Sequence, residues 1–227
     1  MKLPLLVCAV VAATSAIAFR PAWFGSLWFW VSLLGCYGTL ASIAIYRMWD
    51  EGLLRQIFTL RRGDFSLGVI SGLVLIAGAW LGEMMITPVG SLEHSWRIYV
   101  QLLVGDPLEL RRSIPLTLAL LVIAALEEIV WRAMVLDSLM QRFGARRAWP
   151  LGALLYAISL LPTAYTLAGP AGPNPLLPLA ALGCGLVWSF MARLVGRLPP
   201  MIISHMVFSY FIASQFRLPL SLPTDAG

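Results

Sequence analysis

Three charged side chains lie in the middle of a long apolar run, residues 114–139: Glu127, Glu128 and Arg132. An ionised side chain at the centre of a membrane helix costs about 2.5–3.5 kcal/mol unless it is paired, so such residues indicate a functional site. Glu128 and Arg132 are four positions apart and share a helix face, which predicts an ion pair. Glu127 is turned by about 100° from Glu128, has no cation on its own helix face, and is the candidate general base.

A histidine in the last apolar run is the second candidate. An imidazole inside a membrane can share a proton or hydrogen-bond an oxyanion, and His205 lies within Ser204–Ser209. Alone it would be read as a packing residue. Beside a membrane carboxylate, it is expected to complete a site with Glu127 in one cavity that opens to the cytoplasmic side. Two alternatives stay open for the charged residues, an ion cluster that pins helices together and an ion pathway.

The elements that position these side chains are expected to be membrane helices. A bilayer core of about 30 Å needs about 20 apolar residues of helix, and the apolar runs of this chain have about that length. We expect an all-α polytopic membrane protein with about seven transmembrane helices. The candidate runs are 3–19, 23–46, 65–86, 114–139, 149–168, 175–195 and 198–215.

The remaining segments complete this organisation. A polar loop at 88–112 is expected to hold a short interfacial helix around 96–104, and the Gly/Pro-rich segment 168–175 predicts a sharp loop. The interpretation is one transmembrane domain, 1–227, with N-terminal helices and an outer loop in 1–112 and a catalytic core in 113–215.

The composition supports this class. The chain of 227 residues is 59% hydrophobic and only 12% charged, whereas soluble domains carry about 25% charged residues. This argues against a soluble enzyme, a coiled coil, a disordered protein and a nucleic-acid-binding domain. The net charge of +5 comes from basic residues between the apolar runs, where they act as signals for membrane topology. No nucleic-acid partner is therefore expected. The cysteines Cys8, Cys36 and Cys184 lie in apolar runs and imply no disulfide, and no metal or other cofactor motif is found.

The basic residues also predict an orientation. Ten of the sixteen Lys and Arg residues, from Lys2 to Arg197, fall on the inner side if the N-terminus is cytoplasmic, and five, including Arg217, fall outside. The positive-inside rule therefore favours a cytoplasmic N-terminus, and a bacterial inner membrane is the expected location. Residues 1–18 also fit a cleaved signal peptide, which leaves the other helices oriented in the same way.

The motif Glu127-Glu-Ile-Val-Trp-Arg132, followed by Pro199-Pro-Met-Ile-Ile-Ser-His205, resembles the CPBP (Abi) family, which includes the CAAX prenyl endopeptidases. The resemblance covers residues 114–215. It implies an intramembrane glutamic endopeptidase, without a cofactor, that cleaves a membrane-anchored or lipidated protein. Glu127 would then activate water, Glu128 and Arg132 would be structural or substrate-orienting partners, and His205 would be the histidine of the last helix.

Two positions depart from the family pattern. The family has an aromatic residue followed by histidine four positions later, where this chain has Tyr156 and Leu160, and Ser209 stands where Asn or Asp is usual. Loss of an oxyanion donor typically costs about 10²–10³ in rate. The hypothesis is an intramembrane protease; the alternative is an inactive member that binds a membrane peptide or toxin as an immunity or chaperone-like protein. A transporter would need polar residues on several helices, and 175–195 has only Ser189.

Overall fold

The structure is a computed structural model that describes residues 2–214. Residues 1 and 215–227, among them Arg217 of the orientation argument and the last position of the final apolar run, lie outside the described residues. The regular elements of residues 2–214 are helices, and the β-type pairing found there is an isolated bridge between Gly169 and Gly172. The all-α class is therefore confirmed.

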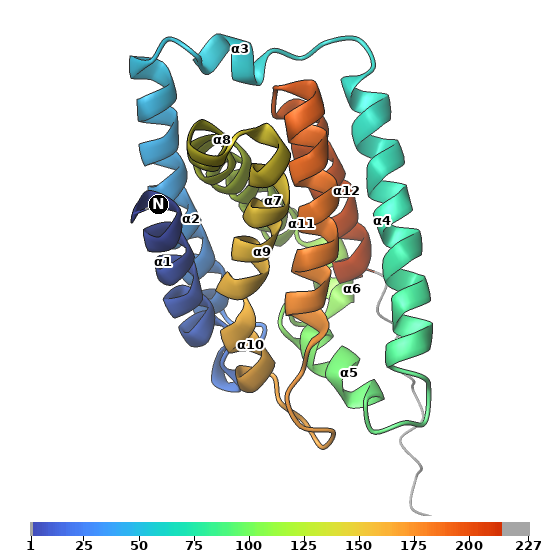
Figure 1. Cartoon of the computed structure of the whole chain (residues 1–227). Helices are drawn as coiled ribbons and strands as arrows, with labels where there is room; N and C mark the ends of the chain where they lie inside the picture. Colours follow the sequence, from blue (N-terminus) through green and yellow to red (C-terminus); the bar gives the residue numbers. More distant parts are fainter. Residues whose placement is uncertain (1, 215–227) are drawn as a thin grey trace, which may run out of the picture.

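In chain order the helices are α1 (Lys2–Ala18), η1 (Pro21–Trp23), α2 (Leu27–Asp50), α3 (Leu54–Phe58), α4 (Asp64–Ile86), α5 (His94–Leu102), α6 (Pro107–Arg112), α7 (Ile114–Glu128), η2 (Ile129–Leu136), α8 (Asp137–Phe143), α9 (Ala145–Ser159), α10 (Leu161–Thr166), α11 (Leu176–Val195) and α12 (Pro199–Ser214). Each predicted apolar run overlaps at least one of them (Figure 1).

Among residues 2–214, five candidate spans have the length and hydropathy needed to cross a bilayer. They are Leu27–Asp50, Asp64–Ile86, Ile114–Phe143, Ala145–Thr166 and Leu176–Val195. Within the described residues α1 has 17 residues and α12 has 16, which is short of the roughly 20 residues that a full span requires. The predicted count of about seven spans is therefore not confirmed.

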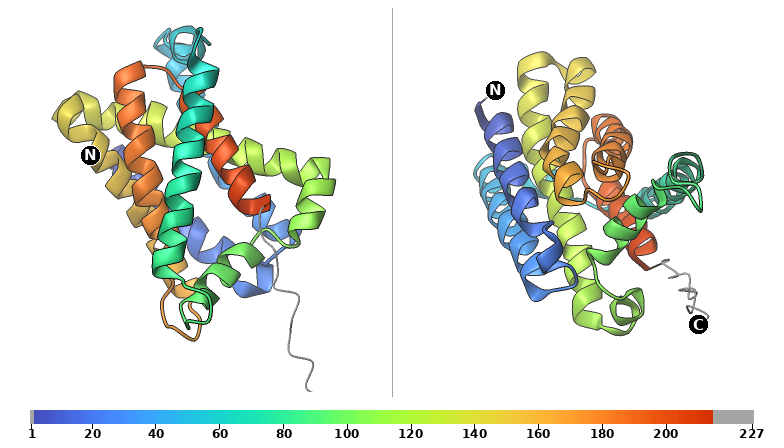
Figure 2. Two further views of the ribbon diagram at one scale, coloured as in Figure 1. Left: turned by 90° about the vertical axis from the view of Figure 1, so that its right-hand side faces the viewer. Right: turned by 90° about the horizontal axis from the view of Figure 1, so that it is seen from below.

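The longest span lies across the other helices. It combines α7, η2 and α8 and has 30 residues, which at 1.5 Å per residue makes it about 45 Å long, longer than the hydrocarbon core of about 30 Å. It is seen nearly end-on in Figure 1, and the left view of Figure 2 shows it running across α11 and α4. A helix too long for the bilayer accommodates itself by tilting.

The middle of this long helix is a π-helix, which sequence reasoning did not predict. The wider turns cover Ile129–Leu136 and begin directly after Glu128. Such π segments inside α-helices are frequent at functional sites. The start of the helix follows ordinary rules, because the Ser113 side chain accepts a hydrogen bond from the Leu116 N–H and Pro115 occupies the first turn.

The predicted run 149–168 is broken at Leu160, where α9 ends and α10 begins. Pro162 lies in the first turn of α10. It has no N–H to donate to the Ile158 carbonyl, and its ring would clash with that carbonyl if the helix continued unbroken. The Leu160 N–H therefore bonds to the Ala157 carbonyl at 3.1 Å, as in the last turn of a helix. Leu160 thus lies at a bend between two helices, whereas the sequence predicted one unbroken helix over 149–168.

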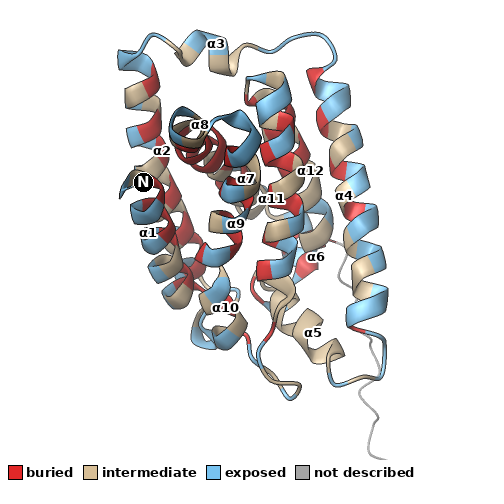
Figure 3. Cartoon of the chain, viewed as in Figure 1, coloured by how far each residue is buried: buried red, intermediate tan, exposed pale blue. Residues whose placement is uncertain are grey.

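Helix α4 lies at the edge of the molecule and packs closely on α12. Figure 3 shows it largely exposed, as expected for a helix that faces lipid. Two glycines permit the contact: a Cβ on Gly68 would lie 2.7 Å from the Ile203 Cβ, and one on Gly72 would lie 3.1 Å from the Ser204 carbonyl oxygen. The position of α12, which carries His205, therefore depends on small residues of α4.

The two ends of the helix bundle are closed by short elements. At one end α3, which was not predicted, joins α2 to α4 (Figure 1), and the Leu198 N–H bonds to the Ile57 carbonyl at 2.9 Å. Beside it Arg197 forms an ion pair with Asp64. Hydrogen bonding to this carboxylate raises the pKa of Arg197 above its ordinary value, so the arginine stays cationic.

At the opposite end α5 contacts the 168–175 loop. The Trp96 indole N–H donates to the Gly172 carbonyl at 3.2 Å, and the Asn174 amide donates to the Trp96 carbonyl at 2.8 Å. The predicted helix around 96–104 is confirmed as α5, His94–Leu102, and the predicted Gly/Pro loop is confirmed as well. These contacts fix α5 across one end of the bundle.

Candidate active site

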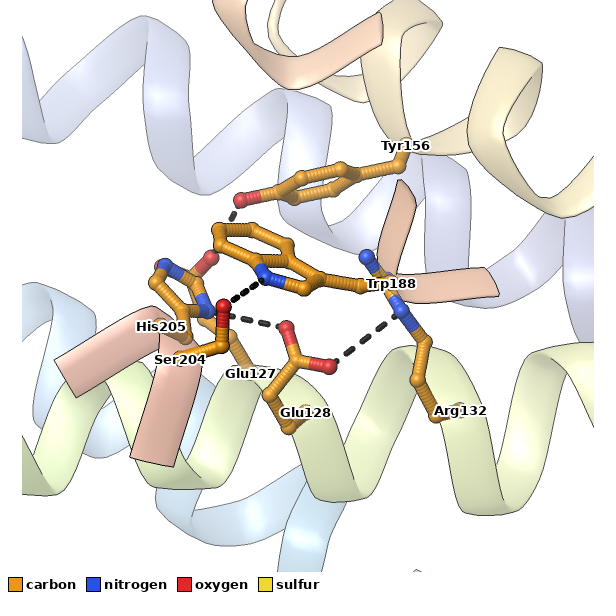
Figure 4. A network of polar contacts seen from close by, with 7 residues as sticks. All are labelled: Glu127, Glu128, Arg132, Tyr156, Trp188, Ser204 and His205. Atoms are coloured by element: carbon orange, nitrogen blue, oxygen red, sulfur yellow. Dashed lines mark hydrogen bonds and ion pairs between the residues drawn. The ribbon is translucent and has the colours of Figure 1, made fainter. Parts of the chain in front are cut away.

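Side chains from four segments meet in a polar cluster inside the bundle. The long helix, α9, α11 and α12 contribute the members that Figure 4 shows: Glu127, Glu128, Arg132, Tyr156, Trp188, Ser204 and His205. All four site residues predicted from the sequence, Glu127, Glu128, Arg132 and His205, belong to it.

Glu128 is the centre of this cluster. Its side chain is 1% exposed, Oε1 lies 2.9 Å from His205 Nδ1, and Oε2 lies 3.3 Å from Arg132 Nε. The ion pair expected from the four-residue spacing is thus present, as a charge contact without hydrogen-bond geometry. The bond to His205 was not predicted, because helix spacing carries no information on a residue 77 positions away.

Arg132 is a buried cation between two aromatic rings. It is 3% exposed, and its Cζ lies 5.3 Å from the centroid of the Tyr156 ring and 5.6 Å from that of Trp188. Cation–π contacts stabilise a guanidinium in such a position. Within residues 2–214 its Nη2 has no hydrogen-bond partner. The buried positive charge is therefore stabilised by Glu128 and by these two rings.

His205 is held on two sides. Its ring stacks on the Trp188 indole with centroids 4.0 Å apart and planes inclined by 24°, and the Trp188 N–H in turn donates to Ser204 Oγ at 2.9 Å. Because a carboxylate only accepts hydrogen bonds, Nδ1 donates to Glu128. That bond fixes the ring orientation and leaves Nε2 for another partner. Trp188 was missed by sequence reasoning, since a tryptophan in an apolar run carries no signal of its own.

Glu127 has different surroundings from Glu128. Its Oε2 accepts a hydrogen bond of 2.6 Å from the Tyr156 hydroxyl, and the ion pairs found within residues 2–214 do not include it. The Tyr156 ring packs on Trp131, with centroids 5.1 Å apart. Glu127 is therefore a carboxylate with a hydroxyl partner and without an ion pair among the described side chains, and the predicted lack of a cation on its own helix agrees with this.

A cavity of about 230 Å³ begins at this cluster and contains Glu127 and His205 in its wall, but neither Glu128 nor Arg132. Its lining is mostly apolar, and within the described part of the chain it includes no Lys or Arg. The wall also includes Gln101, Val104, Tyr156, Leu160 and Ser209. The two glutamates are thus separated: one faces the cavity and the other lies behind it.

The cavity extends toward the end of the bundle that carries α5. Its wall includes Gln101 and Val104 near α5, Phe29 at the start of α2 and Leu177 at the start of α11. With a cytoplasmic N-terminus this end is the outer one, so the predicted cytoplasmic opening and the predicted orientation are not compatible. The reason is the tilt of the long helix, because residue counts along a tilted helix do not measure depth.

Residues 2–214 hold no group of three or more His, Cys, Asp or Glu side chains arranged to bind a metal ion. Around the cavity the potential ligands of this kind are Glu127 and His205, with Cys184. A zinc site typically takes three or four protein ligands around one point. The described residues thus offer no preformed metal geometry.

Comparison with known families gives a match over the segment that carries this site. The family model "Type II CAAX prenyl endopeptidase Rce1-like" matches residues 110–211, which run from α6 into α12. Comparison with curated proteins and with solved structures gave no significant match. The resemblance proposed from the sequence motifs is confirmed over residues 110–211, and several apolar helices support a multi-pass membrane protein.

Proposed function

We propose that this protein is an intramembrane endopeptidase that cleaves a membrane-anchored or lipidated protein with water activated by Glu127. One observation carries the proposal: Glu127 lies in the cavity wall, accepts a hydrogen bond from Tyr156, and shares that wall with His205. The match to a protease family over residues 110–211 supports the reaction class.

The hydrolytic step uses Glu127 as base and then as acid. Its carboxylate takes a proton from water while the water oxygen bonds to the carbonyl carbon of the scissile peptide, and the carbonyl electron pair moves to its oxygen. When the tetrahedral intermediate collapses, the C–N bond breaks and Glu127 returns the proton to the nitrogen. Such transfer by a positioned side chain typically contributes about 10²–10⁴ in rate.

His205 is proposed to stabilise the oxyanion of that intermediate. Nδ1 is bound to Glu128 at 2.9 Å, and the stacked Trp188 fixes the ring plane. A protonated imidazole would donate from Nε2 toward the cavity, and the Glu128 carboxylate is positioned to balance its charge. Donors held in place before the reaction are the effective ones, because they need no reorganisation.

The cavity wall favours an apolar, uncharged segment as substrate. Apart from Glu127 and His205, the described lining residues are uncharged and mainly aliphatic or aromatic. Burying an unpaired charge there would be costly. The substrate is therefore proposed to present an apolar stretch of chain, or a lipid attached to it, along this wall.

The topology is proposed to complete seven passes, with α1 and α12 as the two shorter ones, and 113–215 as the catalytic core. A cytoplasmic N-terminus in a bacterial inner membrane follows from the distribution of Lys and Arg. Labelling of single cysteines introduced near Arg47 and Arg97 with a membrane-impermeant reagent tests this orientation. Reaction from outside only near Arg97 is expected, and reaction only near Arg47 would reverse it.

The proposed activity is tested by comparing membrane proteomes of the native host carrying the wild-type chain, Glu127→Gln or Glu51→Gln. New protein termini are mapped by mass spectrometry at equal expression. Glu51 lies at the far end of α2 with a side chain 44% exposed, so it serves as the matched control. Termini present with wild type and Glu51→Gln but absent with Glu127→Gln are expected. Identical termini in all three would contradict the proposal.

A further inference from the structure

The cavity wall holds a second proton-bearing group beside Glu127 that no sequence motif assigns. The Tyr156 hydroxyl lies 2.6 Å from Glu127 Oε2. One helical turn later Leu160 contributes an aliphatic side chain to the same wall. The oxyanion of a tetrahedral intermediate usually needs more than one donor, and His205 supplies one.

We propose that Tyr156 is a catalytic residue of this chain, whose hydroxyl is the second hydrogen-bond donor to the tetrahedral intermediate, in the place left without a donor by Leu160. This inference rests on the proposed function. Its basis is the contact of the hydroxyl with the reacting carboxylate and its place in the wall of the cavity.

Other hydroxyls near Leu160 are committed to the backbone. Ser159 Oγ donates to the Tyr156 carbonyl at 2.7 Å and Thr163 Oγ1 donates to the Leu160 carbonyl at 2.6 Å. Both residues are 0% exposed, and neither belongs to the cavity wall. Tyr156 is thus the hydroxyl of this bend that is both in the wall and bonded to the base.

The Tyr156 ring is held rigidly enough to present its hydroxyl without reorganisation. The ring, which belongs to α9, packs on Trp131, and the Arg132 guanidinium carbon lies 5.3 Å from the centroid of the Tyr156 ring. On the α11 side a Cβ built on Gly185 would lie 3.2 Å from Tyr156 Cδ1, so helix backbone approaches the ring closely. A hydroxyl on a ring fixed in this way costs little to align with a transition state.

Every proton moved in the proposed cycle comes from water, and no further reactant is needed. In the resting site the phenol O–H donates to Glu127. When Glu127 takes the proton of water, its carboxyl group becomes a weaker acceptor, and the phenol O–H turns to the oxygen that gains the carbonyl electron pair. On collapse the C–N bond breaks, Glu127 gives its proton to the nitrogen, and the phenol returns to the regenerated carboxylate. Tyr156 keeps its proton throughout.

The test measures cleavage of a synthetic peptide spanning a mapped cleavage position by purified full-length protein in detergent micelles. Tyr156→Phe retains the ring and is expected to lower the rate by about 10²–10³, with an unchanged unfolding temperature. Adding Leu160→His to Tyr156→Phe places an imidazole on the same wall. The double variant is expected to cleave at least about tenfold faster than Tyr156→Phe alone. Tyr210→Phe, on an exposed part of α12, is the matched control and is expected to retain the wild-type rate.

The outcomes separate this inference from the proposed function. If the wild type does not cleave, the proposed function fails. If the wild type cleaves and Tyr156→Phe cleaves equally well, or if its rate and unfolding temperature fall together without rescue by Leu160→His, the role of Tyr156 is overturned. Should Tyr156→Phe not fold, 3-fluorotyrosine at position 156 decides, because it keeps the ring and makes the hydroxyl a stronger hydrogen-bond donor. A changed cleavage rate at an unchanged unfolding temperature supports the donor role, and an unchanged rate contradicts it.

Discussion

Glu127 and Glu128 are neighbours in the chain, but their carboxylates have different surroundings. Glu128 is 1% exposed and lies between a guanidinium and an imidazole. Glu127 is half-buried, bonds to a phenol, and lies in the wall of a cavity. The 100° between successive helix positions is enough to place one carboxylate in the packed interior and the other at an open space.

This difference separates stability from reactivity within one turn of helix. A buried ion pair is strongly coupled, because removal of one partner leaves an uncompensated charge in low dielectric. A carboxylate at a cavity can exchange its partner for water or substrate. The comparison therefore predicts that changes around Glu128 affect folding, whereas changes at Glu127 affect chemistry.

The largest effect on stability is expected for Arg132→Met. The variant leaves the Glu128 carboxylate without its cation, and breaking a buried pair typically costs about 3–5 kcal/mol. Thermal unfolding in detergent, read with a fluorescent dye, measures the loss. A double variant, Glu128→Leu with Arg132→Met, removes both charges and is expected to regain most of the stability but no activity, since His205 loses the partner of Nδ1. An Arg132→Met protein as stable as the wild type would show that the pair is not coupled.

A smaller effect is expected where α4 meets α12. Gly72→Leu would place side-chain atoms against the Ser204 carbonyl, 3.1 Å from a built Cβ, and overpacking typically costs about 1–3 kcal/mol. Because Ser204 precedes His205, the cleavage rate should fall as well. Gly78→Leu on the same helix is the control, since a Cβ there has no described atom within 4 Å. Equal behaviour of the two variants would contradict the packing argument.

Ser204→Ala is expected to act more weakly. It removes the acceptor of the Trp188 indole N–H, a bond of 2.9 Å, and a lost hydrogen bond typically costs about 1 kcal/mol. The orientation of Trp188 over His205 should loosen, which is measured by indole fluorescence quenching together with the unfolding temperature. Ser42→Ala on α2, where the hydroxyl bonds only within its own helix, provides the comparison. An effect of Ser42→Ala as large as that of Ser204→Ala would remove the case for a positioning role.

The smallest effect is expected for Glu51→Gln. Arg47 and Glu51 lie 3.7 Å apart with side chains 41% and 44% exposed, and exposed i,i+4 pairs contribute about 0.3–0.5 kcal/mol. Neither the unfolding temperature nor the cleavage rate should change measurably. A marked loss would mean that the polar end of α2 takes part in the site.

Much of the site could be predicted from the chain itself. The cost of charge in an apolar run drew attention to Glu127, Glu128 and Arg132, and helix spacing assigned the ion pair to Glu128. His205 was found as a histidine in an apolar run. These signals are local, because they depend on residue type and on positions within one turn of helix.

Contacts between helices could not be predicted in this way. The bond from His205 to Glu128 and the stacking on Trp188 join α12 to α7 and α11, and no periodicity encodes such pairings. The oblique course of the long helix and its π turns were not predicted either, and for this reason the predicted cavity opening and the predicted orientation do not agree. Tyr156 was located near Leu160 from the sequence, but spacing does not show where its hydroxyl points.

The division between the two glutamates is tested most directly by measuring unfolding temperature and peptide cleavage on the same preparations of Glu127→Gln and Glu128→Gln. Glutamine keeps the size and shape of each side chain, removes the charge and replaces one acceptor oxygen by an NH2 donor. Glu127→Gln is expected to unfold at the wild-type temperature and to cleave about 10²–10⁴ times more slowly. Glu128→Gln is expected to unfold at a lower temperature than the wild type. If Glu127→Gln cleaves normally, or if both variants lose stability to the same degree, the assignment of Glu127 as the base is contradicted.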